Sequence, residues 1–489
     1  MSDTASLRAP GSPATDPADL GVLEAAWQLA AGTLSSRELT EACLGRIEER
    51  NGGAPTFDGA PDRINAWVRL YPDLAREQAG QADERRARER QATPLLCGIP
   101  IGVKDLYAVA GLPLTGSSRV LEDNVASADS TAYRRLREHG MVLLGHTHTH
   151  EFAAGGTTDQ SGNPWALDRI VGGSSGGSAA ALAARMTPAA LGSDTCGSLR
   201  IPSACCGTST IKPTHGRIPL DGILPLAGSL DHPGPMARTV ADCAAILSGM
   251  AAGPGATTAL FPPPAPIGAL AFEPRAGTSP LDGVTVALTD RPEKIPLNEE
   301  VARGFDEAVR ACERLGATVI RRAAPWELDW DDLSLVLMSE VWAYHRTHAE
   351  RHDRYRPQVA EFIEAARNFT DAQAYVAAQE RRAAGVAAWE EWFAQEGIDC
   401  VLEPTLPILP PPRGPGYERG HPAGPGDPLI AFTAMWDMTG MPVVSLPLSW
   451  CVGVSLAAPR GREASLTQVA IDLQEHALGI PAYPISWAP

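Results

Sequence analysis

Three polar elements of the sequence carry the residue types that could do chemistry. Lys104 follows the apolar run of residues 99–103, where an ammonium group is costly to bury, and desolvation lowers a lysine pKa until the amine can act as a base. The second element is the Gly/Ser cluster of residues 172–178, which includes Ser174, and the third is residues 192–200, which includes Ser198. One helix between these loops would bring both serines to the same edge of a sheet.

The Gly/Ser cluster by itself is open to simpler interpretations. A glycine-dense loop before the helix-forming residues 179–184 could hold a phosphate through its N–H groups, but it lacks the Gly-Lys-Ser/Thr ending of a P-loop. Gly172, Ser174 and Gly176 match the nucleophile elbow of α/β-hydrolases, although residues 163–169 resemble a loop where that motif requires a strand. Taken alone, the cluster is most simply a turn.

Short apolar runs and helical segments alternate along the chain, which is typical of an α/β protein with buried strands. Strands are expected at residues 99–103, 141–145, 189–192, 401–402 and 443–446, and a βαβ unit at 284–288, 299–315 and 317–320. Ser35 and Glu38 form a capping box that begins an amphipathic helix. A second, charged helix is expected from Tyr71 to Arg90.

The composition excludes several functions. Of the 489 residues 44% are hydrophobic, enough for a large core, and the formal net charge of −17 repels nucleic acids and anionic lipids. Nine cysteines are too few for a disulfide scaffold, so reduced thiols in a cytoplasmic protein fit best. No signal peptide is visible, and the uncharged residues 244–272, with three consecutive prolines, are expected to form a loop rather than a membrane span.

Lys104, Ser174 and Ser198, in these motifs and this order, resemble the amidase signature family, whose enzymes use a Ser, cis-Ser, Lys triad. The resemblance covers residues from about 39 to about 447. It includes residues 145–152, 163–165, 212–214 and 229–240. It implies the α/β amidase signature fold, in which a large mixed, twisted β-sheet forms the core and helices flank both of its faces.

The domain organisation follows from the shared sheet that the triad requires. Residues 1–17 are expected to be a disordered tail, because they are rich in Pro, Ser, Ala and Asp. Residues 18–489 would then form a single amidase domain. Its parts are a helical N-terminal part (18–95), the catalytic core (96–325), a helical insertion (325–396), and C-terminal strands with a helix (397–489). The aromatic side chains of the insertion could cap a pocket, and core packing explains them equally well.

Carried over residue by residue, the resemblance implies that Ser198 is the nucleophile and Lys104 the base. Ser174 would bridge the two, with its peptide bond to Gly173 in the cis form. A serine hydroxyl is a weak nucleophile, and a neutral lysine could draw its proton through the bridging hydroxyl. Backbone N–H groups of the nucleophile loop would form the oxyanion hole: those of Thr195, Cys196, Gly197 and Ser198. Ser175, Asp194 and Arg200 would support these residues.

The sequence departs from the family pattern in two places. The family usually has two glycines before the nucleophile, and here Cys196 takes the first position. Its side chain is most simply a small wall residue that shapes substrate choice, with a thiol near the acyl site as the alternative. The turn between Trp450 and residues 451–454 is shorter than is usual in the family.

His146, His148 and His150 alternate, and a period of two would place them on one strand face, where they could hold zinc. The structural interpretation is preferred, because the segment follows a buried run and resembles a family segment that binds no metal. No metal and no cofactor are therefore expected.

The expected function is hydrolysis of a carboxamide C–N bond in a linear small-molecule amide, through a serine acyl-enzyme. The expected pocket includes Phe152, Gly155, Gly156 and Trp436. Two methionines and a tryptophan in residues 435–438 favour an apolar or aromatic acyl group, unless they belong to the core.

Two alternatives keep the same triad. One is a subunit that hydrolyses glutamine and passes ammonia to a partner, as in the glutamyl-tRNA amidotransferase A-type subunits, which the chain also resembles. The other is a biosynthetic acyl transferase. A third interpretation is a binding or scaffold protein without activity. The expected partner is a small-molecule amide, with no nucleic acid and no membrane, and the chain could form a homodimer.

Overall fold

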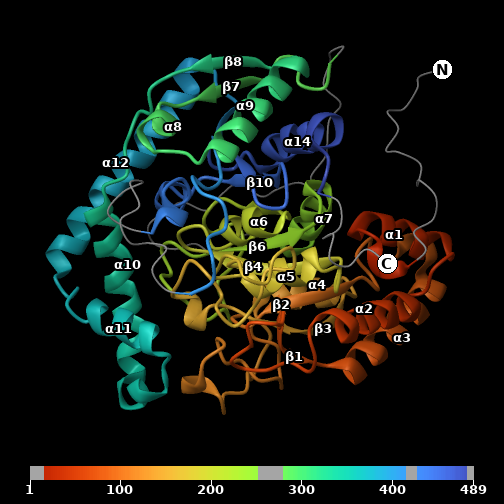
Figure 1. The fold of residues 1–489 in the computed structure, drawn as a ribbon. Coiled ribbons are helices and arrows are strands. Elements are labelled where there is room, and N and C mark those ends of the chain that lie inside the picture. Colours follow the sequence, from red (N-terminus) through yellow and green to blue (C-terminus); the bar gives the residue numbers. More distant parts are fainter. Residues whose placement is uncertain (1–15, 252–278, 415–426, 482–489) are drawn as a thin grey trace.

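The computed structural model describes residues 16–251, 279–414 and 427–481. One 11-stranded sheet runs through this part of the chain in the order β1-β3-β2-β4-β6-β5-β10-β11-β9-β7-β8. The strands are β1 (Trp67–Leu70), β2 (Pro100–Lys104), β3 (Val142–Thr147), β4 (Ala189–Asp194), β5 (Ser209–Lys212), β6 (His232–Ala237), β7 (Thr285–Leu288), β8 (Thr318–Arg321), β9 (Cys400–Pro404), β10 (Val443–Pro447) and β11 (Gly453–Ala457). In Figure 1 they descend from β8 at the top to β1 at the bottom.

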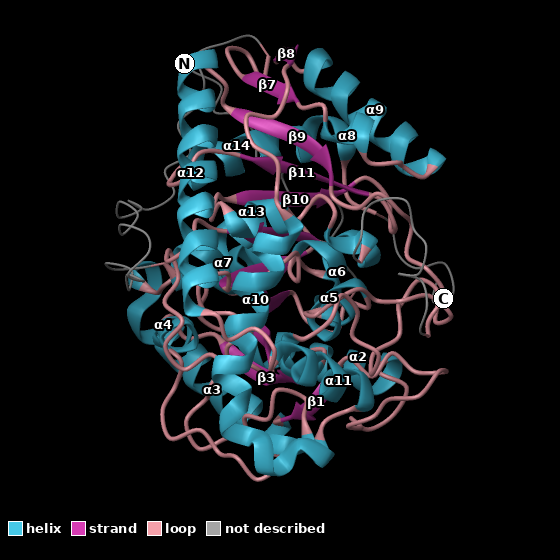
Figure 2. Cartoon of the chain, turned by 90° about the vertical axis from the view of Figure 1, so that its left-hand side faces the viewer, coloured by secondary structure: helices cyan, strands magenta, loops and turns pink. Residues whose placement is uncertain are grey.

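Fourteen α-helices of the described residues surround this sheet, and Figure 2 shows them on both of its sides. They are α1 (Val22–Ala31), α2 (Ser36–Arg50), α3 (Pro72–Glu89), α4 (Thr131–Glu138), α5 (Gly176–Ala183), α6 (Arg200–Cys206), α7 (Val240–Met250), α8 (Arg291–Lys294), α9 (Glu299–Arg314), α10 (Trp330–His345), α11 (Pro357–Ala366), α12 (Ala372–Glu396), α13 (Ala434–Met438) and α14 (Glu463–Leu473). The sheet is mixed: β2 lies parallel to β3 and β4, and β4 lies antiparallel to β6. The expected α/β fold with a large mixed sheet is confirmed.

The predicted local elements are also present. Ser35 caps α2, with Glu38 completing the capping box, and α3 fills most of the charged segment predicted as a helix. Strands β2, β3 and β4 are buried throughout, because each lies inside the sheet and has helices packed on it. The predicted βαβ unit is β7, α9 and β8, whose two strands pair in parallel.

Three expectations about segments need correction. Residues 244–250, expected in a loop, belong to α7, whose apolar side chains are buried against the sheet; residues 252–278 lie outside the described residues. The expected disordered tail is outside them as far as residue 15, but Asp16 accepts a hydrogen bond from the Ala18 N–H and pairs with Arg46. Strand β3 ends at Thr147, so His148 and His150 do not continue its face.

The helical insertion contains α10, α11 and α12, which pack on one another and lie together on one side of the molecule in Figure 1. It is fastened to the loop before β6. Arg382 of α12 is 1% exposed and donates to the Ser229 carbonyl at 2.8 Å. Glu340 of α10 accepts from the Ser229 N–H at 2.8 Å. The insertion is therefore positioned against the catalytic core by buried polar contacts.

All nine cysteines lie within the described residues and each is a free thiol, as expected. Among the described helices, none combines the length and the apolar character that a membrane crossing requires.

Candidate active site

The candidate site lies where two neighbouring parallel strands end. Strand β2 ends at Lys104 and β4 at Asp194, and their register pairs Val103 with Leu191. Because the carboxyl ends of parallel strands meet at one edge, the lysine and the nucleophile loop after β4 come together. Helix α5 connects the Gly/Ser cluster to β4, which places Ser174 at that edge too.

Lys104 is fully buried among three hydroxyl groups. Its Nζ atom lies 2.8 Å from the Ser174 Oγ, 2.8 Å from the Ser175 Oγ and 2.9 Å from the Ser193 Oγ. Burial lowers the pKa of Lys104 from 10.5 to about 7, against the opposing effect of the nearby Asp194 and Asp231 carboxylates. A substantial fraction of this amine is therefore neutral near pH 7 and able to accept a proton.

Ser174 is held by its backbone. The Gly173–Ser174 peptide bond is cis, as expected. The Ser174 carbonyl accepts from the His150 N–H and from the Thr158 Oγ, both at 2.9 Å. A Cβ atom on residue 173 would come within 2.5 Å of the Thr157 carbonyl carbon, so glycine is needed there. The loop of residues 155–157 thus lies directly against the catalytic turn.

Ser198 lies next to this turn on the following loop. Its carbonyl accepts from the Ser175 N–H at 3.2 Å, and the residue is 6% exposed, whereas Lys104 and Ser174 are not exposed at all. Within the described part of the chain, no hydrogen bond joins the hydroxyls of Ser174 and Ser198. The structure therefore connects the lysine to the bridging serine directly, and connects the two serine loops through their backbones.

The four N–H groups expected to form the oxyanion hole are not equivalent. The Gly197 N–H donates to the Asp194 carboxylate, so this donor is already used, which corrects its assignment to the hole. In the described residues the N–H groups of Thr195, Cys196 and Ser198 make no hydrogen bond. Gly197 has a φ of 134°, and the Thr433 side chain occupies the space that a Cβ would need.

A buried ion network fixes the nucleophile loop from below. Arg200 donates to Asp194 through Nε at 2.9 Å and through Nη2 at 3.0 Å, and to Asp437 at 2.5 Å; all three side chains are fully buried. The Asp194 carboxylate also accepts from the Leu199 N–H at 3.1 Å. Asp194 and Arg200 thus hold both ends of the loop that carries Ser198, as the sequence led us to expect.

Cys196 is partly exposed, and its carbonyl accepts a 2.5 Å hydrogen bond from the Thr433 Oγ. Burial raises the pKa of its thiol well above the usual value, so the thiol stays protonated. Its side chain packs against a cluster of apolar residues that includes Leu230, Val336 and Met438. These observations fit a wall residue rather than a reactive thiolate.

The expected pocket residues separate into two groups. Phe152 is fully buried and its ring packs against Tyr344, His345 and Tyr355 of the insertion. Trp436 is 1% exposed and donates through Nε1 to Glu403 at 3.1 Å. Both belong to the core, which corrects their placement in a pocket wall.

Gly155 and Gly156 do lie near the site. Gly155 sits against the His150 ring, Gly156 sits beside the Asp427 carboxylate, and the next residue, Thr157, contacts Gly173.

The three alternating histidines have structural partners. His146 lies 2.9 Å from the Tyr71 hydroxyl, and His148 lies 2.9 Å from the Thr56 carbonyl. Burial lowers the pKa of His148 to about 4. Among the described residues, no three side chains of metal-binding type form a cluster.

Two residues of the site were not anticipated. Ser193 supplies the third hydroxyl around Lys104, and Asp231 accepts from the Thr195 Oγ at 2.6 Å. Burial raises the pKa of Asp231 to about 7. Ser193 could have been found from the parallel arrangement of β2 and β4, which brings the residue before Asp194 close to Lys104. No local signal distinguishes Asp231.

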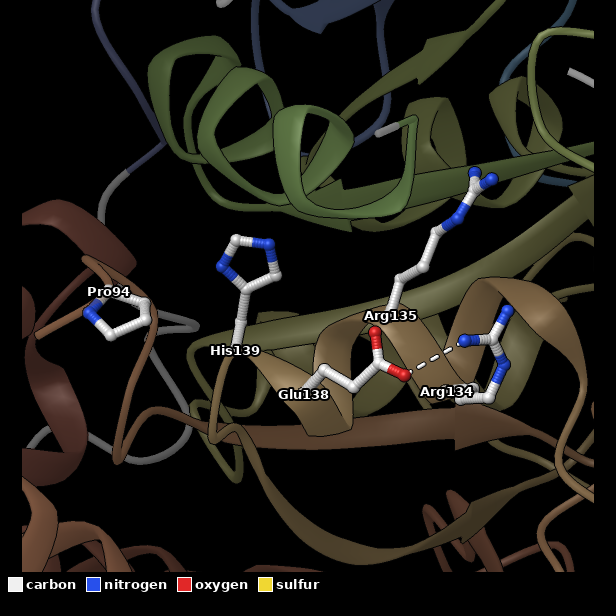
Figure 3. Close-up of a pocket in the computed structure, with 5 residues that line it drawn as sticks. All are labelled: Pro94, Arg134, Arg135, Glu138 and His139. Atoms are coloured by element: carbon white, nitrogen blue, oxygen red, sulfur yellow. Dashed lines mark hydrogen bonds and ion pairs between the residues drawn. The ribbon is translucent and has the colours of Figure 1, made fainter. Parts of the chain in front are cut away.

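A surface cavity of about 380 Å³ lies elsewhere, beside α4. Figure 3 shows its lining residues, and the dashed line marks the ion pair between Arg134 and Glu138, which is 2.8 Å long. Arg135 donates to the Met250 carbonyl at 2.8 Å. None of the residues around Lys104 lines this cavity, so it is separate from the candidate site.

Comparison with solved structures defines the class of the fold. The chain superposes on the crystal structure of an amidase with a TM-score of 0.79 and 27% identity, over 94% of this chain and all of the other. The fold is therefore the amidase signature fold. A sequence model of the Amidase family matches residues 38–467, and the chain belongs to this family.

Two curated relatives share one name. The chain is similar to the A-type component of glutamyl-tRNA(Gln) amidotransferase from Myxococcus xanthus, with 32% identity over 493 residues, 92% of this chain and 96% of the relative. It is 40% identical to the protein of the same name from Cupriavidus metallidurans over 310 residues. This second match spans 61% of this chain and 60% of the relative, which is less than two thirds of either.

Proposed function

We propose that the protein cleaves the C–N bond of a carboxamide through an acyl-enzyme on Ser198, and that the acyl donor is a small linear amide. The observation that carries the proposal is the fully buried amine of Lys104, 2.8 Å from the Ser174 hydroxyl and with a pKa of about 7. A neutral amine bound to a serine hydroxyl, on a turn beside a second serine, is the arrangement that a relayed proton transfer requires.

The reaction uses the three residues in turn. The Ser198 oxygen attacks the amide carbon while its proton passes to the Ser174 oxygen, and the Ser174 proton passes to Lys104. The N–H groups of Thr195, Cys196 and Ser198 bind the oxyanion. The protonated lysine returns the proton by the same path to the leaving nitrogen, which departs as ammonia or an amine. Water then attacks the ester and releases the acid.

A small rotation of the Ser198 side chain completes the relay, because the two serine loops are already joined through the Ser175 N–H and the Ser198 carbonyl. Catalytic hydrogen bonds of this kind often form only once the substrate is bound.

The test is a panel of primary amides with detection of released ammonia and of the acyl-enzyme by mass spectrometry. The wild type should form the adduct on Ser198, and Ser198→Ala and Lys104→Ala should lose turnover by about a thousandfold. An adduct on another residue, or unchanged turnover in Ser198→Ala, contradicts the proposal.

A second candidate is a glutamine-hydrolysing component that passes ammonia to a partner. The similarity to curated relatives named as the A-type component of glutamyl-tRNA(Gln) amidotransferase favours it more than it favours a stand-alone amidase. It uses the same triad, so the distinction is the acyl donor and the dependence on a partner. Glutaminase activity that appears only after a partner is added would support it, and amide hydrolysis by the purified single chain would count against it.

A further inference from the structure

We propose that the acyl part of the substrate is an uncharged, apolar group, which packs against Cys196 and the apolar side chains around it. The inference rests on the proposed function, because it takes Ser198 as the nucleophile. It concerns which amide is used, and so it also separates the two candidate functions.

Exposure indicates the side from which a substrate reaches the nucleophile. Lys104 and Ser174 are fully buried, while Ser198 retains 6% exposure and Cys196 is partly exposed. The lysine side of Ser198 is therefore closed by protein. A carbonyl carbon bound to the Ser198 oxygen must carry its acyl chain on the side of Cys196.

That side is built from apolar residues. Cys196 packs on the cluster containing Leu230, Val336 and Met438, and other apolar side chains around this cluster are only partly buried. Four of them come from the insertion and from the segment before α13: Trp330, Leu337, Tyr375 and Ile430. Such side chains gain by covering an apolar ligand, because that removes their remaining surface from water.

The charged groups beside the cluster already have partners. Glu340 accepts from the Ser229 N–H at 2.8 Å and from the Tyr375 hydroxyl at 2.7 Å. Arg382 is 1% exposed and bonded to Ser229, and Asp231 accepts from Thr195. A substrate charge placed among these groups would lose its hydration without gaining a new partner, which is costly. Glutamine carries two such charges next to its side chain.

The experiment compares amides that differ in one property at a time. Pentanamide and glutamine share a five-carbon skeleton, and only glutamine is charged. The series from acetamide to hexanamide adds one methylene at a time, and a buried methylene should raise kcat/KM about fourfold. We expect pentanamide to exceed glutamine at least tenfold, and each step of the series to raise kcat/KM until the apolar surface is filled.

Variants locate the effect. Ile430→Ala and Trp330→Ala should flatten the increase along the series while leaving acetamide hydrolysis close to wild type, because acetamide has no chain to pack. Val376→Ala is the matched control, since Val376 is an apolar residue of α12 that is 55% exposed. It should leave the whole series unchanged. Melting temperatures of all three variants establish that they are folded.

Binding to Ser198→Ala keeps the inference separable from the proposed function. Calorimetry with pentanamide and with glutamine measures the preference without turnover. Stronger binding of pentanamide that weakens in the double variant with Ile430→Ala supports an apolar acyl site even if no amide is hydrolysed, a result that would overturn the proposed function alone. Equal or stronger binding or turnover of glutamine overturns the inference and leaves the triad chemistry intact.

Discussion

Replacing Lys104 by methionine should change both the activity and the way stability depends on pH. The chain has three lysines, Lys104, Lys212 and Lys294. Burial lowers the pKa of Lys104 and of Lys212 to about 7, whereas Lys294 is exposed and its pKa is raised by Asp290 and Glu327. Lys104→Met keeps the volume of the side chain and removes the titrating amine. Lys294→Met is therefore a matched control.

The sign follows from the numbers of bound protons. Between pH 7 and pH 10.5 the unfolded chain holds the Lys104 proton and the folded chain has released it, so stability rises with pH in this window. The slope is about 1.4 kcal/mol per pH unit once the folded amine is neutral. Integrated from pH 7, where the folded amine is half protonated, to pH 9, the gain is about 2 kcal/mol. Below pH 7 the penalty of burying the ammonium is complete.

The assay is reversible urea unfolding of wild type, Lys104→Met and Lys294→Met at pH 7 and pH 9. The stability difference between wild type and Lys104→Met should shift by about 2 kcal/mol between the two pH values, in favour of the wild type at pH 9. Lys294→Met should show no such shift. In parallel, wild-type kcat/KM should fall about tenfold per pH unit below 7, and Lys104→Met should lose that limb with about a thousandfold loss of rate. Equal pH dependence of stability in wild type and Lys104→Met would refute the reasoning.

Three further predictions concern the supports of the site. Asp194→Asn should move the acidic limb of kcat/KM to lower pH, because the Asp194 charge raises the Lys104 pKa, and should cost about 3 kcal/mol of stability through the broken pair with Arg200; a limb that moves to higher pH contradicts this. Thr433→Val removes the hydrogen bond to the Cys196 carbonyl and should lower kcat more than it changes KM, with about 1 kcal/mol lost in urea unfolding; an unchanged kcat would show that this bond does not position the loop. Ser35→Ala removes the cap of α2 and should cost about 1 kcal/mol in the same assay with full activity, and a loss of activity would contradict its purely structural role.

The sequence allowed prediction of the features that depend on local periodicity and on short motifs. The capping box at Ser35, the buried strands β2, β3 and β4, and the parallel pair β7 and β8 are all visible as patterns of apolar residues and turn residues. The gathering of Lys104, Ser174 and the loop of Ser198 at one sheet edge follows from the order of strand, loop and helix. These features require no knowledge of long-range packing.

The pocket could not be predicted in the same way, because it depends on which way side chains turn in irregular segments. Phe152 and the next residue, Ala153, have φ angles of 50° and 62°, and this left-handed backbone accompanies a Phe152 ring that is packed against the insertion. Trp436 lies on α13, and its indole N–H donates to Glu403, a residue of β9 that is adjacent only in the folded chain. Neither contact has a signature in the sequence near the residue.

The role of Asp194 shows how the buried charges of the site depend on one another. Its carboxylate holds the nucleophile loop through the N–H groups of Gly197 and Leu199, and a bare negative charge at this position would stabilise the protonated form of Lys104. Arg200 compensates much of that charge through two hydrogen bonds and is itself bound to Asp437. The loop therefore gains a strong acceptor for its N–H groups while the amine remains able to lose its proton near pH 7. A neutral acceptor such as asparagine would spare Lys104 the charge, but it would accept only through one oxygen and would leave Arg200 partly uncompensated in the core.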